Sequence, residues 1–168
     1  DLGPGRTAVA VDTGGHTCAI LDNGDLKCWG NNDYGQLGDG TTTSRNSPPS
    51  TPIDFGDGRT AVAVSLGGQH GCAILDDGSV KCWGYGNMGQ LGTGTSSASY
   101  TTLSPSTPVD MYGTSRSAVA ISSGGNSNCA ILETGDATCW GQNTWSALGT
   151  HGPNINPVDK PTRRLEIG

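Results

Sequence analysis

The chain has 168 residues, a length that a single domain can account for. It carries a formal net charge of −6, contains 28 glycines and is only 33% hydrophobic. The negative charge argues against nucleic acid as a partner, because the phosphate backbone is itself negative. No apolar run approaches the ~20 residues that a membrane helix needs, so we expect no membrane span. The composition favours a thin core with many turns.

A short apolar strand is the first predicted element, and it recurs along the chain. Residues 8–11 and 61–64 both read Ala-Val-Ala-Val, and residues 118–121 read Ala-Val-Ala-Ile. Alanine, valine and isoleucine leave these segments without a polar side, so we expect strands that are buried on both faces. A pair of glycines follows each strand and predicts a turn.

A hairpin with a cysteine near each end is the second predicted element. Each copy reads as a short strand, a turn and another short strand. In the first copy Gly24 stands where a tight turn needs a positive φ angle, which costs glycine little. If residues 22–24 form the loop, antiparallel pairing places Ile20 opposite Leu26. The three copies occupy residues 18–30, 72–84 and 129–141.

The same pairing places the two cysteines of each hairpin directly opposite each other, within reach of disulfide geometry. All six cysteines are then paired, which indicates an oxidising compartment and an extracellular location, secreted or at the cell surface. A zinc site is not expected, because the spacing lacks the short C-x2-C motif. The predicted disulfides join Cys18 with Cys28, Cys72 with Cys82, and Cys129 with Cys139.

A glycine-rich phrase and then a polar stretch follow the hairpins. The phrase ends in Gly-Gln-Leu-Gly at residues 35–38 and 89–92. In the third unit the equivalent residues 146–149 read Ser-Ala-Leu-Gly and retain only the final Leu-Gly. The polar stretches of the first two units are rich in Ser, Thr and Pro, so we expect them outside the sheet core. Their composition fits O-glycosylated segments and equally fits bare solvated loops. The candidate O-glycosylation sites are Thr41, Thr42, Thr43, Ser44, Ser47, Ser50, Thr51, Ser96, Ser97, Thr101, Thr102, Ser104, Ser106 and Thr107.

The repeat spacing defines the predicted architecture. Cys18 and Cys72 are 54 residues apart, and Cys72 and Cys129 are 57 apart. A period near 50 with about four short strands per unit is typical of propellers and solenoid arrays. We predict an all-β single domain of three propeller-type blades built from short antiparallel strands, as an incomplete propeller or a repeat array. The approximate units are residues 4–56, 57–111 and 112–168.

The ordered phrase Gly-x-His-x-Cys-Ala-Ile-Leu-Asp-x-Gly-x-x-Lys-Cys-Trp-Gly, followed by Gly-Gln-Leu-Gly, resembles the regulator-of-chromosome-condensation repeat. Two copies match this phrase closely, and the third has diverged from it. The resemblance implies four-stranded blades of a β-propeller, which has seven blades in that family, and this chain looks like a cysteine-stapled extracellular variety. The family's nucleotide exchange on a small GTPase depends on a particular loop of a full propeller, and no residue here maps onto it. Chromatin binding fits an acidic, disulfide-bonded chain poorly.

Histidines recur at one position of the repeat. His16 and His70 each lie two residues before the first cysteine of a hairpin, where the third unit has Ser127. Equivalent positions lie one blade apart, so a metal or catalytic site would need further converging partners. We expect His16 and His70 to be structural, hydrogen-bonded side chains. His151 is isolated in a predicted loop.

Tryptophans fall into two groups. Trp29, Trp83 and Trp140 repeat in register, so we expect them to form the packing surface between blades. Trp145 has no tryptophan counterpart in the other units, which makes it the candidate for an exposed contact.

No motif predicts catalysis or a cofactor. The sequence has no Gly-x-Ser-x-Gly elbow, no HExxH and no P-loop. The Asp-Asn-Gly-Asp turn lacks the spacing and the terminal Glu of a calcium-binding EF-hand loop, and such residues are common in tight turns. We therefore expect no catalytic, cofactor-binding or metal-binding residues.

Two functions fit these observations. The first is a non-enzymatic extracellular structural protein that assembles head-to-tail into a fibril, sheath or wall, with copies of itself or further repeats as partners and possible covalent glycans. The alternative is a secreted propeller-type module that grips or inhibits a protein partner. Residues 1–3 match the end of a unit and residues 163–167 match a first strand, so we expect two different open faces. A head-to-tail contact between copies would cover both faces, in a ring or a filament. The alternative is a fragment of a longer chain, whose further blades would cover them.

Overall fold

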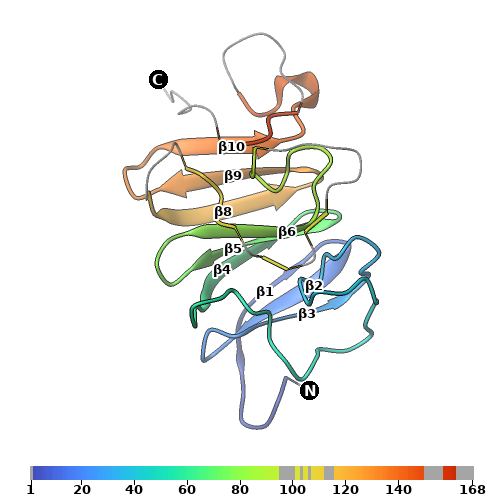
Figure 1. Cartoon of the computed structure of the whole chain (residues 1–168). Helices are drawn as coiled ribbons and strands as arrows, with labels where there is room; N and C mark the ends of the chain where they lie inside the picture. The colour runs from blue at the N-terminus through green and yellow to red at the C-terminus, as the bar shows by residue number, and fades with distance from the viewer. Residues whose placement is uncertain are drawn as a thin grey trace.

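The computed structural model describes residues 2–94, 101–102, 104–105, 107–111, 116–149 and 157–161. Within these residues the regular structure is antiparallel β-sheet, apart from the short 3-10 helix η1 (Thr144–Ser146). Three small sheets follow one another along the chain and stack in that order (Figure 1). The fold is therefore all-β with three propeller-type blades, as the sequence predicts.

Each sheet comes from one repeat unit. The first has the order β1-β2-β3, the second β4-β5-β6-β7 and the third β10-β9-β8. Isolated bridges, Gly30 with Arg45 and Gly141 with Val158, mark the fourth-strand place in the first and third units. The strands are β1 (Ala8–Thr13), β2 (His16–Leu21), β3 (Leu26–Gly30), β4 (Ala61–Leu66), β5 (His70–Leu75), β6 (Val80–Tyr85), β7 (Thr101–Thr102), β8 (Ala118–Gly124), β9 (Ser127–Leu132) and β10 (Ala137–Gly141).

The hairpins have the predicted register. Ile20 pairs with Leu26 and Cys18 with Cys28. Gly24 closes the turn with φ 81°, and its N–H donates to the Leu21 carbonyl at 2.9 Å. Disulfides join the two cysteines of each hairpin, with Cα atoms 4.1 Å apart in every case, and the pairs are those that the spacing predicts.

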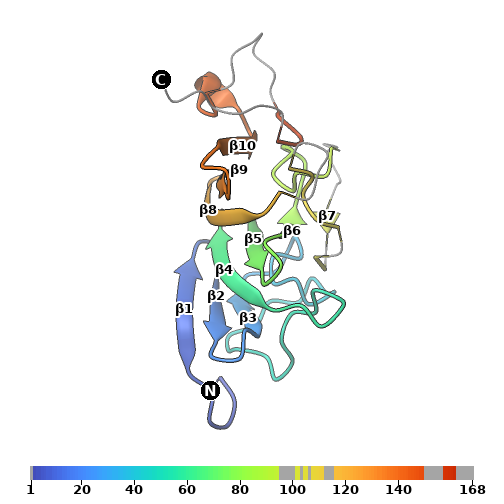
Figure 2. The ribbon, with the colours of Figure 1, turned by 90° about the vertical axis from the view of Figure 1, so that its left-hand side faces the viewer.

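The first strand of each unit is not buried on both faces, so that expectation is wrong. Val9, Val62 and Val119 are 65%, 60% and 62% exposed. The physical reason is a shift of register at the same point of β1, β4 and β8, where each valine is the extra residue of a β-bulge. A bulge interrupts the inward–outward alternation and turns one apolar side chain to the surface. Figure 2 shows β1 beside β4 and β4 below β8, and these neighbours are in contact.

The core lies between the sheets rather than inside any one of them. Trp83 of the second unit is fully buried in one cluster with Leu37 and Ile53 of the first unit. Trp140 of the third unit packs in the same way with Leu91 and Val109 of the second. A single thin sheet cannot bury its own apolar face, so each unit depends on its neighbour.

In the described part of the chain, no helix has the length and apolar character that crossing a membrane requires.

Candidate functional site: the loop face

The loops that follow the third strand of each unit lie on one side of the molecule, on the right in Figure 1. Tyr34, Met88 and Trp145 occupy equivalent places in these loops, and Tyr85 is the last residue of β6, directly before the loop of the second unit. The rings of Tyr34 and Tyr85 meet across two units, with centroids 4.6 Å apart. We call these four residues, Tyr34, Tyr85, Met88 and Trp145, the loop face.

Trp145 is the most prominent side chain of the loop face. It is 93% exposed, against 36% for Tyr34. Its backbone has φ 62°, and Ser146 follows with φ 56°, where the other units have Gly35 and Gly89. A left-handed backbone costs a residue with a side chain on the order of 1–2 kcal/mol. The third unit thus holds an exposed indole on a strained turn, in agreement with the expectation that Trp145 is exposed.

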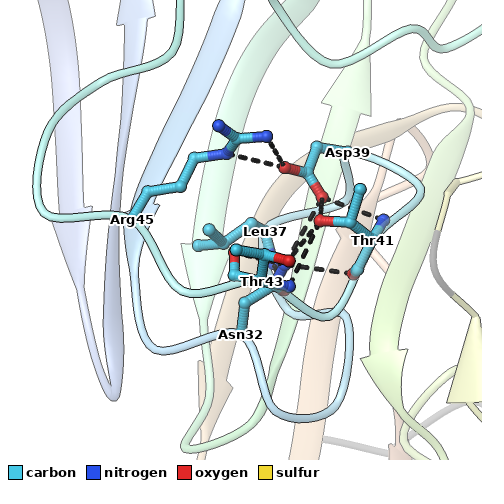
Figure 3. Close-up of polar contacts among 6 residues, drawn as sticks. All are labelled: Asn32, Leu37, Asp39, Thr41, Thr43 and Arg45. Atoms are coloured by element: carbon cyan, nitrogen blue, oxygen red, sulfur yellow. Dashed lines mark hydrogen bonds and ion pairs between the residues drawn. The ribbon is translucent and has the colours of Figure 1, made fainter.

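A polar cage of Asn32, Asp39, Thr41, Thr43 and Arg45 fixes the loop of the first unit (Figure 3). Asn32 is fully buried, and its side-chain amide donates to the carbonyls of Thr41 and Thr43 at 3.0 and 3.1 Å. Its carbonyl oxygen accepts from the Leu37 N–H at 2.9 Å. One buried amide therefore joins the two ends of the loop.

Asp39 is the second centre of the cage. One carboxylate oxygen accepts from the Thr41 hydroxyl at 2.7 Å, and the other accepts from two nitrogens of Arg45, each at 2.8 Å. Partial burial disfavours the charged carboxylate, but the bonds from Thr41 and Arg45 outweigh burial and hold the pKa of Asp39 below its ordinary value. The charges of Asp39 and Arg45 are satisfied within the loop, so the cage is a structural feature.

An open hollow of about 640 Å³ lies beside the cage. Its wall begins where the backbone of Arg45 pairs with Gly30, with N–H to carbonyl distances of 2.7 and 2.9 Å. The hollow offers hydroxyl groups, proline rings and one arginine that is already paired, a surface suited to contact rather than to chemistry. The lining residues are Gly30, Ser44, Arg45, Asn46, Ser47, Pro48 and Pro49.

The Ser/Thr stretch of the first unit is largely at the surface. Thr42, Thr43, Ser44, Ser47, Ser50 and Thr51 are exposed. Thr41 is half-buried in the cage, and the Ser44 hydroxyl accepts from the Asn32 N–H at 3.0 Å. Two of the candidate glycosylation hydroxyls, those of Thr41 and Ser44, are thus held by hydrogen bonds to the protein.

The stretch of the second unit is described only in part. Ser104 and Thr107 are exposed, and the backbone of Thr101 and Thr102 forms β7 at the edge of its sheet. A Cβ atom built on Gly40 would lie 3.5 Å from the Ser104 hydroxyl, so the two stretches meet on the surface. Ser96, Ser97 and Ser106 lie outside the described residues, as does His151.

The two repeated histidines differ, and the prediction for His16 is wrong. Both are buried, His16 at 3% and His70 at 0% exposure. His70 Nε2 is 2.8 Å from the Asn128 side-chain oxygen in the next unit. Neither ring nitrogen of His16 has a hydrogen-bond partner among the described residues. The cause is Gly71, which occupies in the second unit the place that Asn128 has in the third and offers no side chain.

Two of the three repeated tryptophans, Trp83 of β6 and Trp140 of β10, pack between units as predicted. The indole N–H of Trp83 donates to the Gln36 carbonyl at 2.8 Å, and that of Trp140 donates to the Gln90 carbonyl at 3.0 Å. Trp29 of the first unit is half-buried. The described residues contain no cluster of three or more His, Cys, Asp or Glu side chains that could hold a metal ion.

Sequence reasoning missed the cage. The signal is weak, because the second unit has Gly86 and Thr93 where the first has Asn32 and Asp39. Only the Asp-Gly-Thr sequence at residues 39–41 points to a side chain that bonds the backbone two residues on.

Family models place the chain among known proteins. The model of the regulator of chromosome condensation (RCC1) repeat matches residues 23–74 and 77–131, which together make up more than half of the chain. The Ultraviolet-B receptor UVR8 of Arabidopsis thaliana is 34% identical over 150 residues, which are 87% of this chain and 32% of the receptor. The chain thus spans about a third of that relative.

Solved structures agree in fold. Human WBSCR16 has a TM-score of 0.80 and 24% identity, over 95% of this chain and 38% of its own. Yeast RCC1 (Prp20), in a structure where it is bound to Kap60, has a TM-score of 0.76 and 20% identity, over 95% of this chain and 37% of its own. The ordered hairpin, Trp-Gly and Gly-Gln-Leu-Gly phrases, the stacked sheets and these matches lead to one conclusion: the chain belongs to the RCC1 repeat family.

Proposed function

We propose that this propeller-type module binds a protein partner through its loop face, without catalysis of its own. The observation that carries the proposal is Trp145, whose indole is 93% exposed on a turn that includes two left-handed residues. This placement does not stabilise the fold, because the side chain buries almost no surface and the backbone is strained. In protein–protein interfaces a few residues contribute most of the binding energy, and tryptophan and tyrosine are common among them.

The rest of the loop face supports this proposal. Tyr34 and Tyr85 brace each other across two units, so their rings are already ordered before a partner arrives. The cage holds the neighbouring loop of the first unit in one conformation. A rigid surface loses less conformational entropy on binding than a mobile one does. The relative yeast RCC1 is itself known in a complex with a protein, Kap60.

The experiment is a photo-crosslinking search followed by a titration. A photoreactive amino acid at position 145 is exposed to native proteins of the source organism, and the captured protein is purified. Trp145→Ala should weaken its binding by at least on the order of tenfold. Val119→Ala is the matched control, because Val119 is also exposed but lies on β8, away from the loops. Equal affinity of the wild-type chain and the Trp145→Ala variant would refute the proposed surface.

A structural role, as a component of a fibril, sheath or wall that assembles head-to-tail, is the second candidate. It is favoured by the repetition of one packing scheme at both unit junctions, which can in principle continue. The three hairpin disulfides support an oxidising, extracellular setting, and the exposed hydroxyls support O-linked glycans. Electron microscopy of the native protein tests whether it forms long assemblies. The intact mass of the native protein tests whether it carries glycans.

A further inference from the structure

Tyr34 and Tyr85 meet at the junction between the first and second units. Their ring centroids lie 4.6 Å apart, and the planes of the two rings are tilted by 55°. Tyr34 is exposed and Tyr85 is half-buried, so solvent reaches both side chains. Two phenols from different units are therefore in contact at a place that a small oxidant can reach.

Hydrogen bonds hold both tyrosines in place. The Tyr34 N–H donates to the side-chain oxygen of Gln36 at 2.8 Å, and the Tyr85 N–H donates to the Gln69 carbonyl at 2.9 Å. The two units are fixed to each other beside the rings, because the Trp83 indole donates to the Gln36 carbonyl at 2.8 Å. The packing of the units thus brings the two rings together before any reaction takes place.

The disulfides do not link one unit to another. They account for all six cysteines of the chain, and each joins the two strands of a single hairpin. The units therefore depend on one another through non-covalent contacts. At the second junction Met88 and Gln142 occupy the places of Tyr34 and Tyr85, and neither of these side chains is a phenol. The tyrosine pair is a feature of the first junction.

We propose that Tyr34 and Tyr85 form an oxidative cross-linking site, at which hydrogen peroxide and a haem peroxidase couple the two rings into a dityrosine. The two hydroxyl hydrogens leave as two protons and two electrons, and a carbon–carbon bond forms between the ring positions next to the hydroxyl groups. The hydrogens displaced from these ring carbons move to the oxygens and restore the hydroxyl groups. Hydrogen peroxide takes up the two protons and two electrons and becomes two molecules of water.

Contact between the rings favours coupling within one molecule. Two groups that are held together react without the entropic cost of a bimolecular encounter, so the yield should not depend on protein concentration. A link between units restricts the unfolded chain as a disulfide does, and it should raise the urea concentration at which the chain unfolds. This inference goes beyond both proposed functions, because the coupling needs only the two rings and an oxidant.

The test is treatment of the disulfide-bonded chain with hydrogen peroxide and a haem peroxidase at a series of protein concentrations. After reduction and tryptic digestion, mass spectrometry should find residues 28–45 joined to residues 82–116, with two hydrogen atoms fewer than the sum of the two peptides. Oxidation of Met88 adds an oxygen atom instead and is not mistaken for the link. The monomeric chain should carry the link in the same proportion at every concentration.

Variants assign the link to the two rings. Tyr34→Phe and Tyr85→Phe each remove one hydroxyl group and keep an aromatic ring, so each variant should lose the link. Tyr100→Phe/Tyr112→Phe is the matched control, because the second peptide also contains these two tyrosines, which lie outside the described residues. The link should persist in this control. The readout is a covalent product of the chain alone, so it succeeds or fails independently of partner binding and of assembly.

Three outcomes would overturn the cross-linking site. They are a link that survives in Tyr34→Phe or Tyr85→Phe, a link that is lost in the control, and a wild-type chain that couples only between molecules. Urea unfolding with intact disulfides checks the consequence for stability. The linked chain should unfold at a higher urea concentration than Tyr85→Phe treated in the same way, and equal midpoints would refute a stabilising role of the link.

Discussion

The two unit junctions of this protein share their backbone contacts but differ at one buried polar position. Between the second and third units, His70 pairs with Asn128, and the Asn128 amide donates to the Gln90 carbonyl at 2.7 Å. Between the first and second units, Gly71 stands at the place of Asn128, and neither ring nitrogen of His16 has a hydrogen-bond partner among the described residues. The first junction therefore buries an imidazole with neither nitrogen bonded. In the second, Nε2 of His70 joins a hydrogen-bond network, and its Nδ1 has no partner among the described residues.

The difference lies in one residue of the later hairpin, which is Gly71 in the second unit and Asn128 in the third. A Cβ atom on Gly71 would lie 2.7 Å from the Trp83 ring, so no side chain fits there. Where Asn128 is present, its amide joins the histidine of one unit to the backbone of another loop. Two copies of one repeat motif thus differ in their buried hydrogen bonds because one residue differs between the units that follow them.

Acid should destabilise both junctions, and this is the largest effect that we expect. Burial lowers the pKa of His16 to about 4, with a contribution from nearby His70 and against the pull of Asp12. Burial likewise lowers the pKa of His70 to about 4, against its bond to Asn128. An unfolded chain binds these protons near pH 6.5. The stability is therefore complete above pH 6.5 and falls as the pH drops toward 4, by on the order of 3 kcal/mol for each histidine.

Urea unfolding at a series of pH values measures this loss, and the double variant His16→Leu/His70→Leu serves as the control. Asp39 and Asp77 do not contribute in the same window, because their pKa values are lowered below 3.8 and their stabilising effect is lost only in stronger acid. If the double variant kept the wild-type slope between pH 6.5 and 4, the histidines would not be responsible.

Replacing each histidine by leucine near pH 7.5 should separate the junctions. His70→Leu leaves Asn128 with one partner fewer, and we expect a loss of about 2 kcal/mol in the free energy of unfolding. His16→Leu removes a buried polar group that has no partner, and we expect a gain of about 1 kcal/mol. Thermal and urea unfolding measure both values. Changes of the same sign in the two variants would contradict the contrast between the junctions.

The smallest expected effect concerns a contact in which the two junctions agree. The Asp12 carboxylate accepts from the Leu66 N–H at 2.8 Å, and the Ser65 hydroxyl accepts from the Ser123 N–H at 2.9 Å. Asp12→Ala and Ser65→Ala should each cost about 1 kcal/mol of unfolding free energy, because each leaves one backbone donor unpaired. Val11→Ala, on the exposed side of β1, is the control. If only one of these two variants lost unfolding free energy, the contact would not be equivalent in the two junctions.

The sequence predicts the part of the candidate site that depends on a single residue, and it does not predict the parts that depend on contacts between residues. Trp145 stands out in the sequence because the other units have Tyr34 and Met88 at its place, and it is exposed in the structure. The cage was not predictable, because Asn32, Asp39 and Arg45 converge only after the loop has folded back on β3. The pairing of Tyr34 with Tyr85 needs two units at once.

The sequence by itself determined the hairpins, their cysteine pairs and the repeat of propeller-type units. These depend on spacings of ten residues or so, within which strand pairing leaves little choice of register. Tertiary structure decided which histidine finds a partner and which valines are exposed. His70 meets Asn128 from 58 residues away, and Val9, Val62 and Val119 turn outward because a bulge interrupts the alternation. Contacts between units depend on the shapes of both neighbours, and a repeated motif specifies only one of them.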